Sequence, residues 1–246
     1  MRPAIVFLHG FTHTGRSWDP VIAELGQRYR ALAPDIRGHG GAAERRPVNL
    51  AACVDDVLGE VDGGFALVGY SMGARLALRV ALCAPGRVRR LVLIGGTAGI
   101  ADGVERVDRR RRDEALAERV EAGTIEEFVR SWEQQPVLRG QPSAVARAAR
   151  RDRLRNQPAG LAAALRGLGT GAMDPLWSSL GALPMPVTVI VGERDGKFRK
   201  LGERMVAELP DAELVVVQAA GHAVHLEAPA LVAACLRERV SATGSA

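Results

Sequence analysis

Short apolar runs alternate with amphipathic stretches along the first hundred residues. Continuous apolar runs are typical of buried strands, and they occupy residues 4–8, 29–33, 65–69 and 87–95. Apolar residues at helical spacing, with proline or glycine near the ends, fill the stretches between these runs, at 17–26, 50–61 and 72–84. Strands that alternate with helices in this way predict a parallel sheet covered by helices on both faces.

This rhythm stops near residue 100 and returns near residue 186. The intervening region holds only charged helical stretches, at 104–122, 125–132, 144–155 and 161–168. Strand and helix patterns then resume in pairs, at 186–191, 199–209, 213–217 and 230–240. We therefore expect one α/β core of about six strands, in two parts at 1–97 and 184–246, interrupted by a helical cap at 98–183.

One pentapeptide has the pattern of a nucleophile. Gly69-Tyr70-Ser71-Met72-Gly73 matches G-x-S-x-G between a predicted strand and a predicted helix. The turn from strand to helix is so tight that the neighbours of the serine must be small, and it exposes the hydroxyl at the carboxyl end of the strand. The N–H of Met72 at the helix start, and that of Phe11 after the first strand, are then the expected oxyanion donors.

A catalytic serine needs a base and an acid, and where G-x-S-x-G forms such a strand-to-helix turn the acid and then the histidine follow it along the chain. This order leaves His222 and His225 of the five histidines, and His222 directly follows the last strand. Asp195 lies just past the penultimate strand, where a carboxylate would fix the imidazole tautomer. Glu193 and Asp174 remain rival acids. We predict Ser71, Asp195 and His222 as a catalytic triad.

The segments LHGF, DIRGHG, GYSMG, GERD and AGH together resemble the α/β-hydrolase superfamily over nearly the whole chain. Within the cap and around the acid, SWEQQPVL, RLRNQPAGLAAALRGLGTGAMDPLW and GERDGKF are similar to the 2-succinyl-6-hydroxy-2,4-cyclohexadiene-1-carboxylate synthase family. These lyases of menaquinone biosynthesis eliminate pyruvate from 2-succinyl-5-enolpyruvyl-6-hydroxy-3-cyclohexene-1-carboxylate. The resemblance therefore implies the same elimination here, without a covalent acyl-enzyme.

This resemblance also implies a set of substrate-binding residues. Such a substrate carries three carboxylates, and guanidinium groups bind carboxylates bidentately. The positions that match the family are Tyr70, Arg75, Arg109, Trp132, Arg155 and Lys197. Two features depart from the family pattern: the chain begins almost at the first apolar strand, and Gly95-Gly96-Thr97 replaces Ser-Pro-Gly.

The composition limits the kinds of molecule that this protein is expected to bind. The net charge is only +5, and no basic stripe is interleaved with aromatic residues, so a small anionic substrate fits better than nucleic acid. No apolar stretch approaches the length of a membrane span, and the N-terminal run reads as a strand, so a cytoplasmic protein is expected.

No metal cluster or dinucleotide fingerprint is present, so no cofactor is implied. The three cysteines, Cys53, Cys83 and Cys235, are expected to be buried free thiols.

Two other functions remain open at this point. The same triad would serve a carboxylesterase or lactonase that acts on a small anionic ester through an acyl-enzyme. A binding module could also keep the fold without turnover, although an intact nucleophile, acid and base argue against it. The sequence leaves a monomer and a homodimer equally open.

Overall fold

The computed structural model describes residues 2–241 and contains one six-stranded sheet. All neighbouring strands pair in parallel, in the order β2-β1-β3-β4-β5-β6. The predicted α/β fold with a parallel sheet is confirmed. The strands are β1 (Ala4–Leu8), β2 (Arg30–Leu32), β3 (Phe65–Tyr70), β4 (Val88–Ile94), β5 (Val187–Gly192) and β6 (Ala212–Val217).

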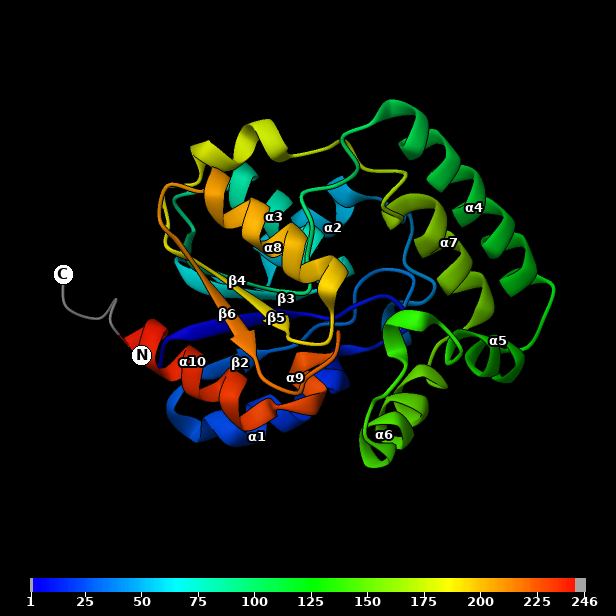
Figure 1. Ribbon diagram of the computed structural model, residues 1–246, viewed down its shortest axis with the longest axis horizontal. Helices are drawn as coiled ribbons and strands as arrows, with labels where there is room; N and C mark the ends of the chain where they lie inside the picture. Colours follow the sequence, from blue (N-terminus) through cyan, green and yellow to red (C-terminus); the bar gives the residue numbers. More distant parts are fainter. Residues whose placement is uncertain (1, 242–246) are drawn as a thin grey trace.

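Helices cover both faces of this sheet, as Figure 1 shows. One face carries α2 (Leu50–Gly59), α3 (Met72–Cys83) and α8 (Gly196–Glu208). The opposite face carries α1 (Asp19–Leu25), α9 (Val224–Glu227) and α10 (Pro229–Ser241). Two buried apolar clusters, one on each face, use alternate residues of the same strands, for example Val6 and Leu8 on one side and Ile5 and Phe7 on the other.

Four helices occupy the chain between β4 and β5 and lie together at one side of the sheet (Figure 1). They are α4 (Gly103–Glu121), α5 (Ile125–Trp132), α6 (Ser143–Arg153) and α7 (Pro158–Leu168). A small apolar cluster of their own joins α4, α5 and α7, and Phe11 of the core packs against it. We call this insertion the cap, and we propose that it spans residues 98–183.

The strand order places two loops next to each other at one edge of the sheet. The chain leaves β1 toward β2 on one side and then returns to β3 on the other, so the order reverses between β1 and β3. Leu8 and Gly69 are register partners at the carboxyl ends of these strands. Ligands bind at such switch points in open α/β sheets. The loop after β1 therefore lies beside the turn that carries Ser71.

The helix ends differ from the sequence expectation at two places. The helical stretch expected at 17–26 is preceded by a 3-10 turn at Gly15–Trp18, whose capping hydrogen bond Thr14 accepts, and α1 follows that turn directly. Helix α8 begins at Gly196 because the Asp195 side chain caps it, three residues earlier than the apolar pattern indicated. The short helix α9 was not predicted, since four residues are too few to show a helical period.

One of the three cysteines is not buried. Cys53 and Cys235 are buried free thiols, as expected, whereas Cys83 is exposed. Cys83 is the last residue of α3, where the helix leaves the sheet. Burial raises the pKa of the Cys53 thiol to about 11, so this side chain acts as a small apolar group.

Two histidines at the carboxyl edge of the sheet are buried and structural. The backbone N–H of Ile36 donates to Nε2 of His9 at 2.9 Å, and the other ring nitrogen of His9 lies 2.9 Å from the Gly10 carbonyl oxygen. The His39 ring packs edge-on against His9 and Phe11. Burial lowers the pKa of His9 to about 4 and that of His39 to about 3. Both rings are neutral in the folded protein.

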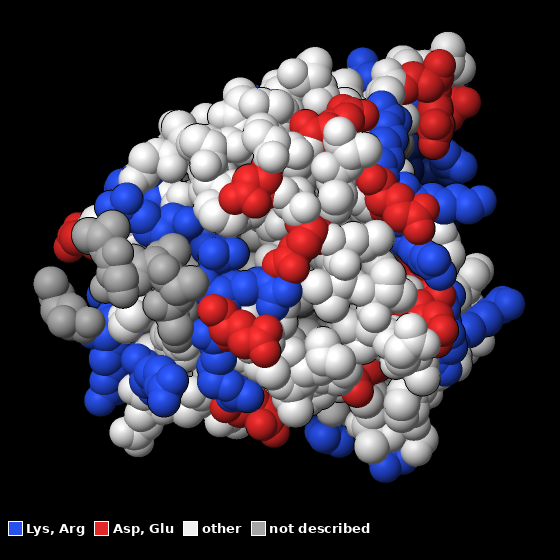
Figure 2. All heavy atoms as spheres, turned by 60° about the vertical axis from the view of Figure 1, so that its left-hand side comes forward, with Lys and Arg blue, Asp and Glu red and all other residues white. Residues whose placement is uncertain are grey.

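Charges of both signs are mixed on the face in Figure 2, where blue and red side chains lie next to one another. Arg239 pairs with both Glu213 and Glu238. None of the helices in the described range is both long and apolar enough to cross a membrane.

The close packing of α3 on β1 gives a first prediction. A methyl group on Gly73 would lie 2.1 Å from the carbonyl oxygen of Leu8. Alanine is better than glycine in a helix by about 1 kcal/mol, yet we expect Gly73→Ala to lower the free energy of unfolding by about 1–3 kcal/mol, because backbone atoms of β1 must move. Urea denaturation measures the change.

Gly86→Ala is the matched control, because nothing lies within 4 Å of the added methyl group at this exposed site. The control should leave stability unchanged or raise it by about 0.4–1 kcal/mol. A Gly73→Ala protein as stable as the control would contradict the packing described above.

The buried neutral histidines give a second prediction. Below the ordinary histidine pKa of 6.5 the unfolded chain takes up a proton at His39, whereas the folded state does not until about pH 3. Stability is therefore fully present above pH 6.5 and falls as the solution is acidified, by about 1.4 kcal/mol per pH unit for each such group.

His39→Gln removes one of these titrating groups. Between about pH 5.5 and pH 4, its free energy of unfolding should fall less steeply with acidification than that of the parent. The difference in slope should be about 1.4 kcal/mol per pH unit, which corresponds to one proton. Urea melts at several pH values supply both curves. Parallel curves would show that His39 is already protonated in the folded state.

Candidate active site

Ser71 occupies a strained turn between β3 and α3. Its φ is +52°, in the left-handed region that residues other than glycine seldom adopt. Its backbone N–H donates to the Ile94 carbonyl oxygen of the neighbouring strand at 2.9 Å. The small neighbours are required, since a methyl group on Gly69 would lie 2.4 Å from the Gly73 carbonyl oxygen. The turn therefore raises the Ser71 hydroxyl above the carboxyl end of the sheet.

An imidazole from far along the chain meets this hydroxyl. Nε2 of His222 lies 3.2 Å from Oγ of Ser71, and Nδ1 lies 2.6 Å from Oδ2 of Asp195. Asp195 and His222 are buried, with 9% and 6% of their surface exposed. The carboxylate fixes the tautomer with the proton on Nδ1, so Nε2 accepts from the serine hydroxyl. This is the geometry of a base that can activate Ser71.

The same carboxylate has a second contact that holds it in place. Oδ1 of Asp195 accepts from the backbone N–H of Phe198 at 3.3 Å and so caps α8. The ring of Phe198 packs 4.4 Å from the ring of His222, measured between centroids. The start of α8 thus positions both the acid, Asp195, and the ring of Phe198 that packs against His222.

The rival residues have other roles in the structure. Glu193 is exposed and accepts from the Ala219 backbone N–H at 2.9 Å, and Asp174 is exposed on a loop of the insertion. His225 is fully buried against Trp18 and Tyr70, and neither of its ring nitrogens has a hydrogen-bond partner in the described part of the protein. Among these groups, only Asp195 and His222 form a chain of hydrogen bonds to Ser71.

The two expected oxyanion donors belong to the loops that meet at the switch point. Met72 is the first residue of α3 and directly follows the nucleophile. A methyl group on Gly10 would lie 3.5 Å from Cβ of Ser71, so the loop after β1 runs directly past the serine. Phe11 is the next residue of that loop. The role of the Phe11 and Met72 N–H groups remains a prediction that this proximity supports.

Two groups lie next to the loop of His222: Glu227, which the sequence did not indicate, and Tyr70, which was expected to bind substrate. Glu227 is almost fully buried, and its carboxylate accepts from the Gly221 backbone N–H at 2.9 Å, directly before His222. Tyr70 lies between His222 and His225, with ring centroids 5.2 and 4.2 Å away. Burial raises the pKa of the Tyr70 phenol well above its usual range. Both residues hold the loop of the base in place.

Arg75 is buried on the first turn of α3, one turn beyond Ser71. Its Nη1 donates to the Leu168 carbonyl oxygen at 2.7 Å and contacts the sulfur of Met173, and it forms no ion pair with a carboxylate of the described chain. Burial, and then repulsion by Arg109, lower the pKa of Arg75 to about 10. A bound anion would relieve both effects.

Three other expected binding residues lie at the edges of the site. Arg109 is 38% exposed and pairs with Asp113 at 2.8 Å. The ring of Trp132 packs 5.2 Å from that of Phe11, so it joins the cap to the loop after β1. Lys197 is exposed, with Nζ 5.8 Å from the ring of Phe198. Trp132 thus contacts the proposed oxyanion loop directly and Lys197 reaches His222 through Phe198, whereas the ion pair of Arg109 is made within α4.

Two cap arginines near the end of α6 differ sharply in burial. Arg155 is exposed in the turn after α6, whereas Arg153, two residues earlier, is 1% exposed. Nε of Arg153 donates to Oγ1 of Thr12 at 3.3 Å, while Nη2 has no partner among the described residues. Burial lowers the pKa of Arg153. Because Arg153 borders the loop of Phe11, it is the better placed of the two to receive an anion.

A pattern in α6 could have identified Arg153. Ala149, Asp152 and Arg153 are its buried residues, which is the spacing of one helix face. Two charged residues on the buried face of a helix are unusual and indicate a polar contact inside the protein. Because arginines are frequent in this part of the sequence, the helix face that carries Asp152 and Arg153 could not be recognised from the pattern.

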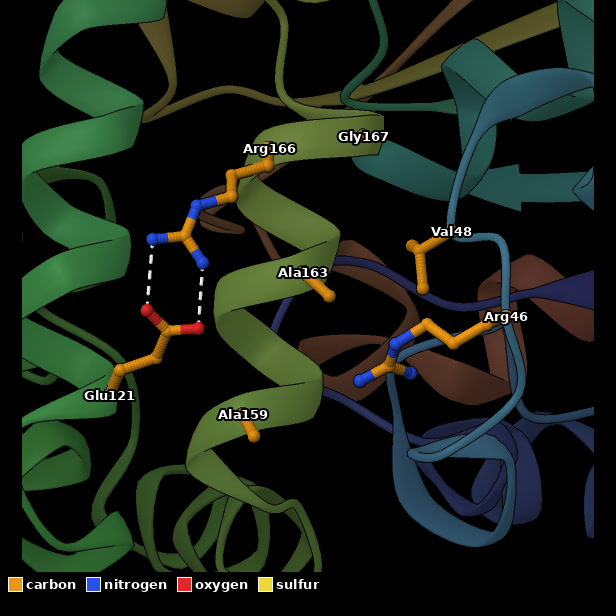
Figure 3. Close-up of a pocket in the computed structure, with 7 residues that line it drawn as sticks. All are labelled: Arg46, Val48, Glu121, Ala159, Ala163, Arg166 and Gly167. Atoms are coloured by element: carbon orange, nitrogen blue, oxygen red, sulfur yellow. Dashed lines mark hydrogen bonds and ion pairs between the residues drawn. The ribbon is translucent and has the colours of Figure 1, made fainter.

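Figure 3 shows a hollow elsewhere on the protein, between α7 and the segment before α2. Arg46, Val48 and Gly167 are among its lining residues, and Arg166 in its wall is bonded to Glu121 through two nitrogens. No triad residue lines it. Within the described residues, no group of three or more His, Cys, Asp or Glu side chains could hold a metal ion.

Comparison with known proteins agrees with the geometry of the site. Residues 5–235 match the model of the alpha/beta hydrolase family. The chain is 36% identical over 93% of its length to a putative 2-succinyl-6-hydroxy-2,4-cyclohexadiene-1-carboxylate synthase of Bacillus subtilis, and covers 86% of that protein. It is 34% identical over 96% of its length to the synthase of that name from Klebsiella pneumoniae, and covers 93% of it.

A solved structure shows the same relationship in three dimensions. The structure of MenH from S. aureus superposes with a TM-score of 0.90 at 29% sequence identity, covering 97% of this chain and 94% of that one. The chain therefore belongs to the alpha/beta hydrolase family and, within it, to the family of 2-succinyl-6-hydroxy-2,4-cyclohexadiene-1-carboxylate synthases.

Proposed function

We propose that this protein eliminates pyruvate from 2-succinyl-5-enolpyruvyl-6-hydroxy-3-cyclohexene-1-carboxylate, with Ser71, His222 and Asp195 as its proton-transfer machinery. The observation that carries this proposal is the Ser71–His222–Asp195 chain of hydrogen bonds near two buried arginines, Arg75 and Arg153. Family membership supports the same reaction. The product is the conjugated 2,4-cyclohexadiene, and no metal or redox step is needed.

The chemistry is a conjugate elimination. The ring proton at carbon 2 lies next to the succinyl carbonyl, and the enolpyruvyl oxygen leaves from carbon 5. When the C2–H bond breaks, its electron pair forms the C2=C3 bond, the C3=C4 pair moves to C4=C5, and the C5–O bond breaks. The leaving enolate of pyruvate gains a proton on carbon and becomes pyruvate. The protein must therefore remove one proton and stabilise charge on the succinyl oxygen.

Ser71 and His222 supply the base. Nε2 of His222 accepts the hydroxyl proton at 3.2 Å, so Ser71 can take the C2 proton as the imidazole becomes cationic. The Asp195 carboxylate at 2.6 Å from Nδ1 stabilises that cation. The strained turn places the Ser71 hydroxyl within hydrogen-bond reach of His222. Serine then acts as a proton carrier and need not form a bond to carbon.

The negative charge that develops on the succinyl carbonyl oxygen needs hydrogen-bond donors to stabilise it. The N–H groups of Met72 and Phe11, on the two loops beside Ser71, are the donors that we propose. They are fixed by the backbone before substrate arrives, so no reorganisation accompanies the charge transfer. One donor of this kind lowers a barrier by roughly 3–4 kcal/mol.

The buried arginines account for selectivity toward a polyanion. Arg75 and Arg153 are cationic groups whose burial lowers their pKa values. Arg75 has no carboxylate partner among the described residues, and Arg153 has only a long contact of 3.9 Å between its Nη1 and Oε1 of Glu133. Leaving a buried cation without a partner is costly. A substrate carboxylate next to each guanidinium would remove that cost, which a neutral ester could not do.

Replacement of the nucleophile tests the proposed reaction. Ser71→Ala should lower kcat for pyruvate release by at least about 10³-fold, since it removes the proton carrier. Ser131→Ala, at an exposed cap position, should leave the rate unchanged. Coupled detection of pyruvate measures both. An unaltered rate in Ser71→Ala would remove this serine from the mechanism, and no pyruvate release by the parent would favour the hydrolase alternative.

Two arginines that lie two residues apart test the binding of the substrate. Arg153→Gln should raise KM by roughly 10-fold or more, because a charge-assisted bond to a carboxylate contributes about 1.5–3 kcal/mol. Arg155→Gln removes an exposed cation from the neighbouring turn and should change KM less than about twofold, as expected for an exposed charge. The reverse ranking would assign the substrate carboxylate to Arg155, as the sequence first indicated.

A further inference from the structure

The loop between β1 and the 3-10 turn at Gly15–Trp18 has a conformation that it would not adopt alone. Thr12 has a φ of +72°, and a β-branched residue is strained in this left-handed region. Such a conformation persists only where the surroundings hold it in place. This loop also carries Phe11, whose N–H is the proposed oxyanion donor. What holds Thr12 therefore also sets the position of that donor.

The C-terminal end of the cap helix α6 holds this loop through a single carboxylate. Asp152 is buried, and its Oδ2 lies 2.9 Å from Nδ1 of His13 and accepts from the Thr14 backbone N–H at 3.0 Å. Its Oδ1 accepts from the Thr14 hydroxyl at 2.5 Å. One side chain of the cap thus receives three hydrogen bonds from two consecutive residues of the core.

Two neighbours of Asp152 complete the contact. Asn156 donates to the Thr12 carbonyl oxygen at 2.7 Å and accepts from the Gly40 backbone N–H at 3.0 Å. Arg153 donates to the Thr12 hydroxyl at 3.3 Å. The end of α6 therefore bonds to Thr12, His13 and Thr14 in turn. This contact differs from the apolar packing of Phe11 against α5, which involves rings only.

We propose that Asp152 is a positioning residue for catalysis: it sets the conformation of the loop at 9–14 and so places the Phe11 N–H toward the oxyanion. Asp152 acts through His13 and Thr14 and does not touch the substrate. The cap thereby contributes to the catalytic framework as well as covering it. This inference rests on the proposed function, because the oxyanion site that it positions belongs to that reaction.

The hydrogen bond from His13, and not the charge of its ring, carries the effect. Burial lowers the pKa of His13, so its ring is neutral and Nδ1 donates its proton to Asp152. The amide nitrogen of an asparagine can replace such a donor. His13→Asn should therefore retain the function that His13→Ala loses.

The test compares Asp152→Asn with Asp56→Asn. Asp56, on α2, also accepts three side-chain hydrogen bonds, from Arg37 and Arg45, but has no contact with the loop. Displacement of a catalytic group by about 1 Å can lower a rate by about 10²-fold. We expect Asp152→Asn to lower kcat for pyruvate release by about 10- to 100-fold with KM within about threefold, and Asp56→Asn to leave both unchanged.

A second measurement keeps this result independent of the substrate. Phosphonylation of Ser71 by a fluorophosphonate also builds charge on an oxygen that needs the same donors. Its rate constant should fall in Asp152→Asn and His13→Ala, and should be restored in His13→Asn. Failure of the proposed function would appear as absence of pyruvate release by the parent, while the fluorophosphonate ranking would remain.

Three results would overturn the inference. Asp152→Asn could react with the fluorophosphonate at the rate of Asp56→Asn. Its KM could rise at constant kcat, which would mean that Asp152 acts on substrate binding through Arg153. Finally, thermal melting could show that all three loop variants lose activity only in proportion to unfolded protein, in which case His13→Asn would show no selective rescue.

Discussion

The sharp turn at Ser71 is the constraint on which the rest of the site depends. Its φ of +52° is maintained by the backbone bond to Ile94 and by glycines on either side that allow β3, α3 and β1 to approach closely. The turn lies where the strand order reverses between β1 and β3. The loop after β1, the start of α3 and the loop after β6 therefore converge on one hydroxyl. Each proposed catalytic group comes from a different part of the sequence and needs this turn to meet the others.

The buried histidines and the buried arginines differ in charge, and this difference distinguishes structural groups from groups that can bind an anion. His9, His13, His39 and His225 are buried, and burial keeps their pKa values low and their rings neutral. The positive charge near the site is carried instead by Arg75, which pairs with no carboxylate of the described chain, and by Arg153, whose ion pair with Glu133 is long at 3.9 Å. A site of neutral rings and incompletely paired guanidiniums favours an anion, and this property links the general hydrolase fold to an elimination on a tricarboxylate.

Sequence patterns were sufficient for features that are local. The apolar runs located the strands to within a few residues, and G-x-S-x-G located Ser71 because the glycines are needed at that spacing. The chain order of acid and histidine selected Asp195 and His222, which the structure brings within hydrogen-bond reach. The parallel sheet and the four helices of the insertion also followed from periodicity alone.

Contacts between distant segments could not be predicted in the same way. Asp152 and Thr14 are 138 residues apart, and nothing in either local sequence indicates the other. The resemblance named Arg155 and did not consider Arg153, because helix phase is uncertain in an arginine-rich stretch. Glu227 and α9 lie in a segment too short for a periodic signal. These residues support the site through tertiary packing, which local patterns do not encode.

The role of Ser71 as a proton carrier distinguishes this account from ester hydrolysis on the same fold, where the serine bonds to carbon. Mass spectrometry of the intact protein, quenched during steady-state turnover of the enolpyruvyl substrate, tests that role most directly. The account predicts pyruvate in solution and a chain of unmodified mass at every time point. A covalent adduct on Ser71 that forms and decays at the rate of turnover would contradict it.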